Sequence, residues 1–465
     1  MDLDLIVIGS GPSGQKAAIQ ASKLGKRVAV VERRARLGGV SIHTGTIPSK
    51  TLREAVLDEL ARRPLDVADP VHPEYRERLV LDFLRDRTAR VVGAEASLVR
   101  EQFRRNGVGL FFGDGAFEDD HTIRITEKST SQVFTSEKIV IAVGTHPARP
   151  PDVDFDDDTI IDSDGLLRLE RRVPKTMTVV GAGVIGVEYA SIFGALGTKV
   201  TVVDQRPRVL GFLDGEIGEA LQYILRRHNV TFRLGEKVSA VTKNAEHRVM
   251  TSLVSGKSIP SETVLYATGR QGATESLQLE RAGLEADPRG RVPIDEDYRT
   301  SVPHIFAVGD VAGPPGLAAT AMEQGRLAAL HAFEQPVQSL PQLIPTGVYA
   351  IPEVATVGLT EEQLTESATP YVAGIARWEE LARGLMTGDE DGMLKLLVST
   401  EDRSLLGVHI IGTGATDLVH IGQAVMGGQG TVDFLVSAVF NYPTFAESYK
   451  VAALDAVNRI NLAAA

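Results

Sequence analysis

One pattern, found twice, constrains this chain more than any other feature. An apolar run typical of a buried strand leads directly into Gly9 to Gly14, and a second such run leads into Gly181 to Gly186. Both glycine segments follow the form Gly-x-Gly-x-x-Gly and continue into a helical stretch and a second apolar strand. Those strands end in an acid, Glu32 or Asp204, 18 residues after the last glycine in each copy. The chain therefore contains two copies of one βαβ unit.

Each part of this unit has a physical purpose. The first glycine permits the tight turn, the second lets a pyrophosphate approach the backbone, and the third allows helix and strand to pack closely. The helix N-terminus then faces the anion, and the acid binds a ribose hydroxyl. A single such segment also occurs as a plain strand–helix turn, but two copies with matched spacing favour two dinucleotide sites. The expected binding residues are Gly9, Gly11, Gly14 and Glu32 in the first site, and Gly181, Gly183, Gly186 and Asp204 in the second.

Charge and composition exclude several other functions. The 465 residues carry a formal net charge of −12 and their basic residues are scattered, so we expect neither nucleic acid nor an anionic membrane as a partner. There is no cysteine, which excludes disulfides, thiolate metal sites and thiol nucleophiles. The histidines lack metal-ligand spacing, so no metal is predicted. The N-terminus lacks targeting features and no apolar run approaches the roughly 18 residues of a membrane span, which predicts a cytoplasmic protein.

The chain divides at two crossings, a proline-rich stretch at residues 147–158 and a second near residues 269–274. Beyond residue 340 the βαβ pattern ends, and strands at 392–398 and 405–411 alternate with helices at 417–426 and 445–458. The predicted fold class is therefore α/β, with two Rossmann-like dinucleotide-binding domains and a C-terminal α+β domain. The expected boundaries are residues 1–150 with 272–340, residues 151–271, and residues 341–465.

Three further segments resemble a known family, the flavoproteins with two dinucleotide-binding domains. The segment Thr300 to Asp310 is similar to that family's second FAD motif, and residues 142–145 and 267–270 are similar to its paired crossings between domains. The resemblance implies that FAD occupies the first site and NAD(P) the second. It also implies that Asp310 binds the flavin ribityl chain and that Gly144 and Gly269 line the two sites.

The segment Gly38 to Lys50 resembles the redox-active segment of the flavoprotein disulfide reductases, whose pattern is GG-x-C-x(4)-C-IPSK. Here the two cysteine positions hold Ser41 and Thr46, and neither side chain accepts electrons from a flavin. Tyr442 stands where the same family has the histidine that serves the thiol, and a phenol with a pKa near 10 is a poor base at neutral pH. The defining reaction of the disulfide reductases is therefore excluded.

Other positions of the family's flavin site are retained. Lys50 and Glu188 match a lysine and a glutamate that pair beside the flavin N5, where a cation stabilises negative charge on the reduced ring. The alternative is that both are ordinary surface residues. Gly39 and Thr46 also belong to the implied FAD site. His43 has two interpretations, a proton shuttle near the flavin or a structural histidine, and hydride transfer between nicotinamides requires neither acid nor base.

The whole chain is similar to the soluble (Si-specific) pyridine nucleotide transhydrogenases of bacteria. The matching segments are residues 152–155, 161–164, 345–349 and 440–444, the last of which includes Tyr442. The resemblance implies ping-pong hydride transfer from NADPH to NAD⁺ through the flavin. One alternative is an NAD(P)H dehydrogenase that passes electrons to a quinone or another non-thiol acceptor, and a second is a non-enzymatic FAD-binding protein.

One position departs from that expectation. A transhydrogenase admits both nucleotides, so a neutral residue is expected at position 204, whereas the carboxylate of Asp204 suits the 2′-hydroxyl of NAD and repels a 2′-phosphate. Arg206 and Arg208 either clamp that phosphate or are solvated loop charges. The preference between NAD(H) and NADP(H) therefore stays open, with a tilt towards NAD(H).

The C-terminal part resembles the family's dimerisation domain, which reaches across to the partner's flavin. This implies a homodimer or a larger homo-oligomer, in which Tyr442 and Glu447 act at the partner's site.

Overall fold

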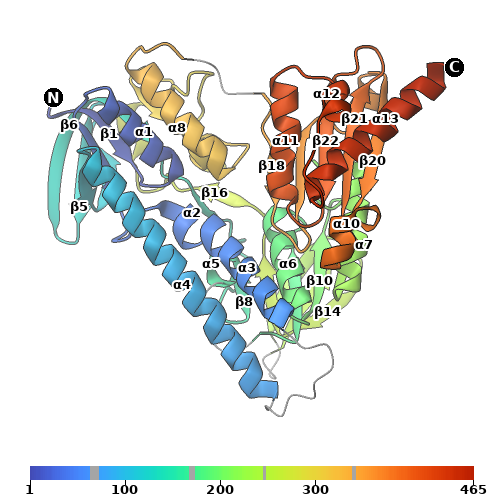
Figure 1. Cartoon of the computed structure of the whole chain (residues 1–465). Helices are drawn as coiled ribbons and strands as arrows, with labels where there is room; N and C mark the ends of the chain where they lie inside the picture. Colours follow the sequence, from blue (N-terminus) through green and yellow to red (C-terminus); the bar gives the residue numbers. More distant parts are fainter. Residues whose placement is uncertain (63–72, 167–172, 244–247, 338–341, 465) are drawn as a thin grey trace.

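The computed structural model describes residues 1–62, 73–166, 173–243, 248–337 and 342–464 (Figure 1). The predicted boundary between residues 340 and 341 lies outside the described residues. Three large sheets organise the chain, one for each of the regions expected from the sequence. The predicted fold class is confirmed.

The first sheet contains the first βαβ unit and has seven strands in the order β3-β2-β1-β6-β5-β4, with β17 paired to β6. Strands β1, β2, β3, β6 and β17 run parallel, whereas β4 and β5 are antiparallel additions. Their bounds are β1 Leu3–Ile8, β2 Val28–Glu32, β3 Gly109–Phe112, β4 Asp114–Phe117, β5 Thr122–Glu127, β6 Thr130–Ile141 and β17 Ile305–Ala307. Because β17 comes from far downstream, the chain returns to this sheet after the second unit.

Helices α1 (Pro12–Lys23) and α8 (Ala318–Ala332) lie side by side over the first sheet (Figure 1). Their contact is rich in alanine, which lets the two helix backbones approach closely. The buried alanines are Ala17, Ala18 and Ala21 in α1 and Ala328, Ala329 and Ala332 in α8. This packing holds the returning segment against the glycine loop that begins α1.

The second sheet is entirely parallel, in the order β11-β10-β9-β15-β8. Helix α6 (Val184–Ala195) follows the second glycine loop, and its residues 186–194 are all buried, as expected for a helix that is apolar on every side. A small antiparallel sheet, β12-β13-β14, packs beside it. The bounds are β8 Ile160–Asp162, β9 Thr176–Val180, β10 Lys199–Asp204, β11 Val230–Leu234, β12 Val238–Lys243, β13 Val249–Leu253, β14 Ser258–Ser261 and β15 Thr263–Tyr266.

The two crossings lie against each other. Strand β7 (Thr145–Pro147) pairs antiparallel with β16 (Arg270–Gly272). Arg270 Nε donates to Thr145 Oγ1 at 2.7 Å, and a second guanidinium nitrogen donates to the Thr145 carbonyl oxygen at 2.8 Å. The chain therefore leaves the first region and returns to it through one shared two-stranded connection.

The C-terminal sheet is antiparallel, in the order β18-β19-β22-β21-β20. The predicted strands at 392–398 and 405–411 correspond to β21 (Met393–Ser399) and β22 (Leu405–Ile411). The helix predicted at 417–426 is α11 (Ala415–Gly427), and the one predicted at 445–458 is a 3₁₀ turn followed by α13 (Ser448–Ala464). The remaining strands are β18 Thr346–Val348, β19 Val354–Gly358 and β20 Tyr371–Arg377.

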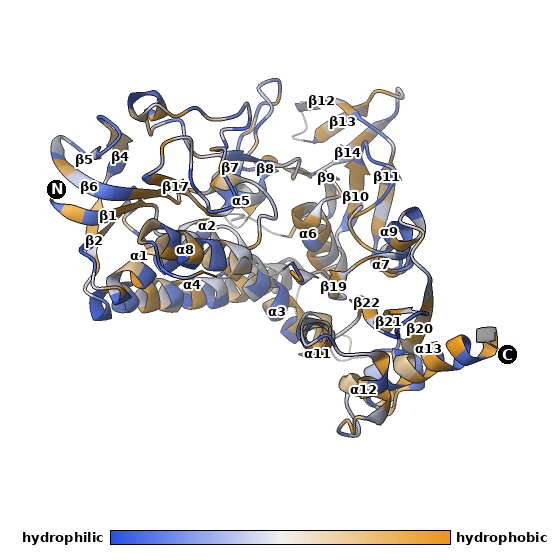
Figure 2. Ribbon diagram, turned by 90° about the horizontal axis from the view of Figure 1, so that it is seen from above, coloured by the Kyte–Doolittle hydropathy of each residue, from blue (hydrophilic) through white to orange (hydrophobic). Residues whose placement is uncertain are grey.

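Helices α3 (Thr46–Arg62) and α4 (Pro73–Arg105) run side by side from the first region towards the second (Figure 1). α4 mixes hydrophilic and hydrophobic residues along its length (Figure 2). None of the helices in the described part of the chain is both long enough and apolar enough to cross a membrane. The shorter helices are α2 Gly39–His43, α5 Ser163–Leu166, α7 Gly215–Arg227, α9 Glu361–Glu366, α10 Ala382–Thr387 and α12 Val432–Ser437.

Candidate functional site

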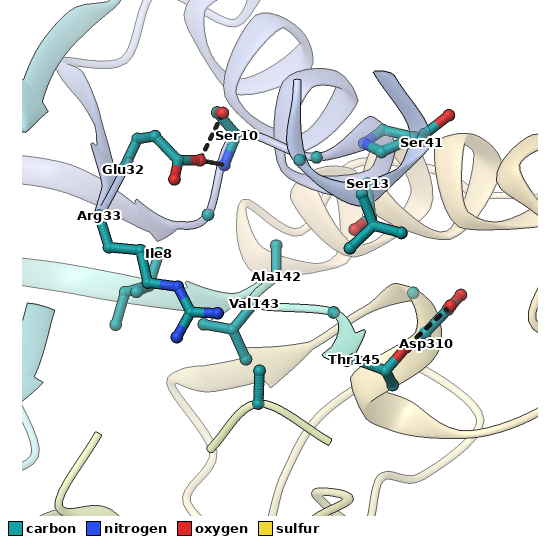
Figure 3. Close-up of a pocket in the computed structure, with 18 of the residues that line it drawn as sticks. Ile8, Ser10, Ser13, Glu32, Arg33, Ser41, Ala142, Val143, Thr145 and Asp310 are labelled. Atoms are coloured by element: carbon teal, nitrogen blue, oxygen red, sulfur yellow. Dashed lines mark hydrogen bonds between the residues drawn. The ribbon is translucent and has the colours of Figure 1, made fainter. Parts of the chain in front are cut away.

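A cavity opens at the carboxyl end of β1, beside the first glycine loop, with about 1100 Å³ of space that includes its open mouth (Figure 3). Most of the residues predicted for the FAD site line it: Gly9, Gly11, Glu32, Gly39, Thr46, Gly144 and Asp310. Gly14 and Lys50 are not part of this lining.

The glycine loop has the geometry that its sequence predicts. A Cβ added to Gly9 would lie 2.3 Å from the Ala142 carbonyl oxygen, and one added to Gly14 would lie 2.0 Å from the Gly9 carbonyl oxygen. A Cβ at Gly11 would meet no described atom within 4 Å, leaving out its chain neighbours. The first and third glycines are therefore required by close packing, whereas the middle one leaves open space in which a ligand can approach the backbone.

Glu32 and Asp310 lie on opposite sides of this cavity (Figure 3). Glu32 Oε2 accepts from the Ser10 amide at 3.1 Å and from the Ser10 hydroxyl at 2.6 Å, and its other oxygen accepts from the Arg34 amide at 2.9 Å. Asp310 Oδ2 accepts from Thr145 Oγ1 at 3.3 Å. The contact between Ser10 and Glu32 was not predicted, because it joins a loop residue that the glycine pattern leaves unspecified.

The two positions that hold cysteine in the disulfide reductases also line this cavity. Ser41 lies in α2 and Thr46 begins α3, and neither residue carries a thiol. His43, at the end of α2, is hydrogen-bonded through Nε2 to the Leu37 carbonyl oxygen at 2.8 Å and does not line the cavity. This bond supports the structural interpretation of His43.

Lys50 and Glu188 meet although 138 residues separate them, with Lys50 Nζ 2.6 Å from Glu188 Oε2. Lys50 lies one turn after Thr46 on α3, so the two share the helix face that reaches the first cavity. Glu188 comes from α6 of the second unit and is buried. The pair therefore joins helix α3, whose first residue Thr46 lines the first cavity, to helix α6 of the second βαβ unit.

Tyr349 completes this arrangement and was not among the predicted site residues. Its amide donates to Glu188 Oε1 at 2.8 Å, and Lys50 Nζ lies 4.9 Å from the centre of its ring. Burial raises the pKa of Tyr349, which keeps the phenol neutral. The segment 345–349 does carry the family resemblance, so this position had a sequence signal, but its contact with Lys50 depends on how three regions pack.

A second cavity, with about 1420 Å³ of open space, lies beside the second glycine loop. Gly181, Gly183, Asp204, Arg206 and Gly269 line it, whereas Gly186 and Glu188 do not. The loop repeats the geometry of the first. A Cβ at Gly181 would lie 2.4 Å from the Ala267 carbonyl oxygen, and one at Gly186 would lie 1.9 Å from the Gly181 carbonyl oxygen.

Asp204 is buried at the wall of the second cavity, and both oxygens of its carboxylate accept hydrogen bonds. Its carboxylate accepts from the Ala182 amide at 2.6 Å, from Arg206 Nε at 3.0 Å, and from another guanidinium nitrogen of Arg206 at 2.6 Å. Burial raises the pKa of Asp204, but the hydrogen bonds from Arg206 outweigh that effect and hold the pKa below its ordinary value. The carboxylate therefore faces the cavity with much of its charge offset by Arg206.

Arg208 does not line the second cavity. A guanidinium nitrogen of Arg208 lies 2.6 Å from Glu362 Oε1, on helix α9 of the C-terminal region. Gly215, at the start of α7, provides the room for this pair, since a Cβ there would lie 2.5 Å from both side chains. Nothing in the local sequence around Arg208 predicted this partner.

Tyr442 and Glu447 line neither cavity. The Tyr442 side chain is 72% exposed, and Glu447 Oε2 is buried without a hydrogen-bond partner among the described residues. Large apolar side chains are exposed in the same part of the chain, and α13 extends from the body of the molecule with hydrophobic residues along it (Figure 2). They include Phe434, Val439, Leu454 and Leu462. An exposed apolar face of this kind is typical of an interface.

Within the part of the chain that the structure describes, one group has ligand atoms close enough to suggest a metal: Asp120, His121 and His304, within 4.8 Å of one another. The two imidazole rings are stacked, 3.8 Å apart and within 5° of parallel. Their in-plane nitrogen lone pairs therefore do not converge on one point. One nitrogen of each ring is also hydrogen-bonded to a carbonyl oxygen, at 2.8 Å in both cases. This geometry assigns no metal to the group, and the absence of a metal stays a prediction.

The two cavities and the antiparallel C-terminal sheet define an enzyme of the two-dinucleotide class. Residues 3–325 match the pyridine nucleotide-disulphide oxidoreductase family, and residues 344–453 match that family's dimerisation domain. The chain therefore belongs to the pyridine nucleotide-disulphide oxidoreductase family.

Curated relatives span nearly the whole chain. It is 55% identical to the soluble pyridine nucleotide transhydrogenase of Mycobacterium tuberculosis, over 99% of this chain and 98% of that protein. It is 43% identical to the soluble pyridine nucleotide transhydrogenase of Hahella chejuensis, over 98% of both chains. Among solved structures, it is similar to the HOCl-induced flavoprotein disulfide reductase RclA of Escherichia coli. That match has a TM-score of 0.86 and 26% identity and covers 97% of this chain and 99% of that one.

Proposed function

We propose that this chain catalyses FAD-dependent hydride transfer between NADPH and NAD⁺, as a transhydrogenase without a redox-active disulfide. The observation that carries the proposal is the wall of the first cavity, where Ser41 and Thr46 occupy the two cysteine positions while both glycine-loop cavities are retained. The names of the relatives from Mycobacterium tuberculosis and Hahella chejuensis support the same activity.

The residues of the first cavity fit FAD. The open space at Gly11 accommodates a pyrophosphate at the N-terminus of α1, where the helix dipole favours an anion. Glu32 and Asp310 both line this cavity, which supports the proposal that Glu32 binds the ribose and Asp310 the ribityl chain. Bound there, FAD would supply the hydride-transfer chemistry between one nicotinamide nucleotide and the next.

Lys50 supplies a positive charge in this arrangement. Its ammonium is held by Glu188 at 2.6 Å and lies against the Tyr349 ring, so its position is set before any ligand binds. A preorganised cation needs no reorganisation when negative charge develops nearby, which is the main source of electrostatic catalysis. We assign Lys50 this role, with Glu188 and Tyr349 as positioning residues.

The second cavity suits a nucleotide that enters and leaves. Apart from Arg289, its described lining comes from residues 150–269, and it lies beside the Gly183 loop. NAD(H) and NADP(H) would take turns in this cavity. His43 has no step in this proposal, because hydride transfer needs no side-chain acid or base.

We also propose a homodimer formed through the C-terminal region, with the domain division expected from the sequence. The exposed apolar side chains near α12 and α13, the unpartnered carboxylate oxygen of Glu447 and the match to the dimerisation domain support it. Tyr442 and Glu447 would then lie at the partner's site.

The deciding experiment mixes the purified protein with NADPH and thio-NAD⁺ in the absence of oxygen and follows thio-NADH at its own absorbance. Turnover that also yields NADP⁺ supports transhydrogenation. If NADH bleaches the flavin and NADPH does not, the proposal fails, and the protein is an NADH dehydrogenase whose acceptors are to be sought among quinones.

A further inference from the structure

Each arginine that follows Asp204 is held by a carboxylate, but the two carboxylates come from different parts of the molecule. Arg206 covers Asp204 inside the second cavity. Arg208 pairs with Glu362 at 2.6 Å, outside the lining of that cavity. Arg206, Lys237 and Arg289 line the second cavity, whereas Arg208 is a further cation that the C-terminal region holds outside it.

The position of Glu362 is fixed by its surroundings. Helix α9 begins with a capping box between Thr360 and Gln363, and the Glu361 amide donates to Asp214 at 3.1 Å. Lys395, fully buried in β21, binds Asp214 at 2.8 Å and Glu361 at 3.2 Å. This buried group anchors the first turn of α9 against the start of α7, next to Arg208.

We propose that Glu362 determines the preference of the second cavity between NAD(H) and NADP(H), by holding Arg208 away from the 2′-phosphate position. This inference rests on the proposed function. When NADP(H) enters, its phosphate draws Arg208 from Glu362 and Arg206 from Asp204. When NAD(H) enters, the Arg208–Glu362 pair stays closed, and a ribose hydroxyl takes the place of an Arg206 nitrogen at the carboxylate of Asp204.

The exposure of the Arg208–Glu362 pair fits such an exchange. The two side chains are 51% and 45% exposed, and exposed ion pairs contribute little net stability. A buried pair would resist opening, because breaking it leaves an unpaired charge away from water. Arg208 makes one hydrogen bond to Glu362, whereas a 2′-phosphate carries a charge of about −1.5 to −2 and three acceptor oxygens, so NADP(H) offers Arg208 a stronger partner.

The test uses ligands that carry the 2′-phosphate but no nicotinamide. The flavin-loaded protein is titrated calorimetrically with adenosine 2′,5′-bisphosphate and with adenosine 5′-monophosphate, and the ratio of the two affinities is compared between variants. We expect Glu362→Gln to raise this ratio in favour of the bisphosphate by up to about fivefold, the upper end for one competing exposed ion pair. The flavin content of each variant checks that it is folded.

The chain offers a matched control. Arg227 on α7 pairs with Asp391 of the C-terminal region at 2.7 Å, with side chains 53% and 41% exposed. Asp391→Asn therefore removes a similar ion pair between the same two regions, away from the second cavity, and should leave the affinity ratio as in the parent protein.

A double variant identifies the group through which Glu362 acts. Arg208→Gln should lower the affinity ratio, and in Glu362→Gln/Arg208→Gln the gain should disappear. An unchanged ratio in Glu362→Gln, or a gain that survives in the double variant, overturns the inference. Failure of the proposed function is seen separately, as a parent protein whose flavin NADPH does not reduce.

Discussion

The acid at the end of the second strand has different partners in the two βαβ units. In the first unit the acid accepts hydrogen bonds from residues of the two adjoining loops, whereas in the second unit an arginine side chain also binds the acid. Glu32 accepts from Ser10 and from the Arg34 amide, and Asp204 accepts from Ala182 and the Arg206 guanidinium. Both acids thus brace the glycine loop in the same way. The added arginine offsets the charge of the second acid, and its side chain is 55% exposed.

The two cavities also differ in what encloses them. Residues between 273 and 321, which return to the first sheet with β17 and α8, form part of the wall of the first cavity. The second cavity has one described lining residue beyond 269, the exposed Arg289. The same glycine-loop pattern is therefore compatible with a retained cofactor in the first cavity and with an exchangeable substrate in the second. The segments that enclose each cavity distinguish the two.

The largest effect on cofactor and nucleotide binding should come from adding a side chain at the third glycine of each glycine loop. Gly14→Ala places a Cβ 2.0 Å from a carbonyl oxygen, and Gly186→Ala places one 1.9 Å from another. Gly14→Ala should yield protein without flavin. Gly186→Ala should keep its flavin but lose reduction by both nucleotides.

Flavin absorbance per chain and anaerobic bleaching measure these outcomes. Gly93→Ala in α4, where a Cβ meets no described atom within 4 Å, is the control and should behave as the parent protein. Full flavin content in Gly14→Ala would contradict the assignment of FAD to the first unit and of the exchangeable nucleotide to the second.

The next largest effect is expected on the rate of flavin reduction, and comparing Lys50 with Lys237 distinguishes catalysis from nucleotide binding. Lys50→Met removes the preorganised cation and should slow flavin reduction about 100-fold, as loss of one electrostatic stabiliser does in other enzymes. Lys237→Met, at the wall of the second cavity, should change nucleotide affinity with little effect on the limiting rate. Anaerobic stopped-flow reduction measures both quantities, and Lys50→Arg should recover part of the rate. A parent-like rate in Lys50→Met would show that this charge is not used.

A smaller effect, on the KM for each nucleotide, is expected from replacing the acids that end the second strands, Asp204 and Glu32. Asp204→Ala removes a charged hydrogen-bond acceptor and releases Arg206, so the KM for NADH should rise about tenfold while that for NADPH does not rise. Glu32→Ala should lower flavin content without changing the ratio of the two KM values. Steady-state kinetics on flavin-saturated protein tests this, and equal increases for NADH and NADPH in Asp204→Ala would contradict it.

The smallest effect tests the junction between the second unit and the C-terminal region. His409 in β22 is fully buried, bonded to Thr356 at 2.6 Å and to the Leu359 carbonyl oxygen at 2.9 Å, and burial lowers its pKa. Because the folded pKa lies below the unfolded value of about 6.5, the unfolded state binds more protons, and stability is lost as pH falls below that value.

The free energy of unfolding should therefore fall below pH 6.5 with a slope that His409→Asn reduces by up to about 1.4 kcal/mol per pH unit. Denaturant titrations at several pH values between 7 and 5 measure the two slopes. Identical slopes would show that His409 takes up its proton equally in the folded and unfolded states.

Much of the fold was predictable because its signals are local. The glycine loops, the strand-ending acids and the long apolar strands β21 and β22 each depend on a few neighbouring residues. Strands β18 and β20 and the short helix α9 were not predicted, since they are stabilised by pairing and packing partners far away in sequence. The pairing of β7 with β16 likewise depends on two segments more than 120 residues apart.

The sequence by itself determined two dinucleotide units, their order along the chain and the loss of dithiol chemistry, because turn geometry and the absence of sulfur are properties of the residues present. Tertiary structure decided which charges meet. Lys50 reaches Glu188 and Tyr349, Arg208 reaches Glu362, and Lys395 reaches Asp214. Such contacts join segments more than 130 residues apart, so only the packing of whole regions brings their atoms within reach.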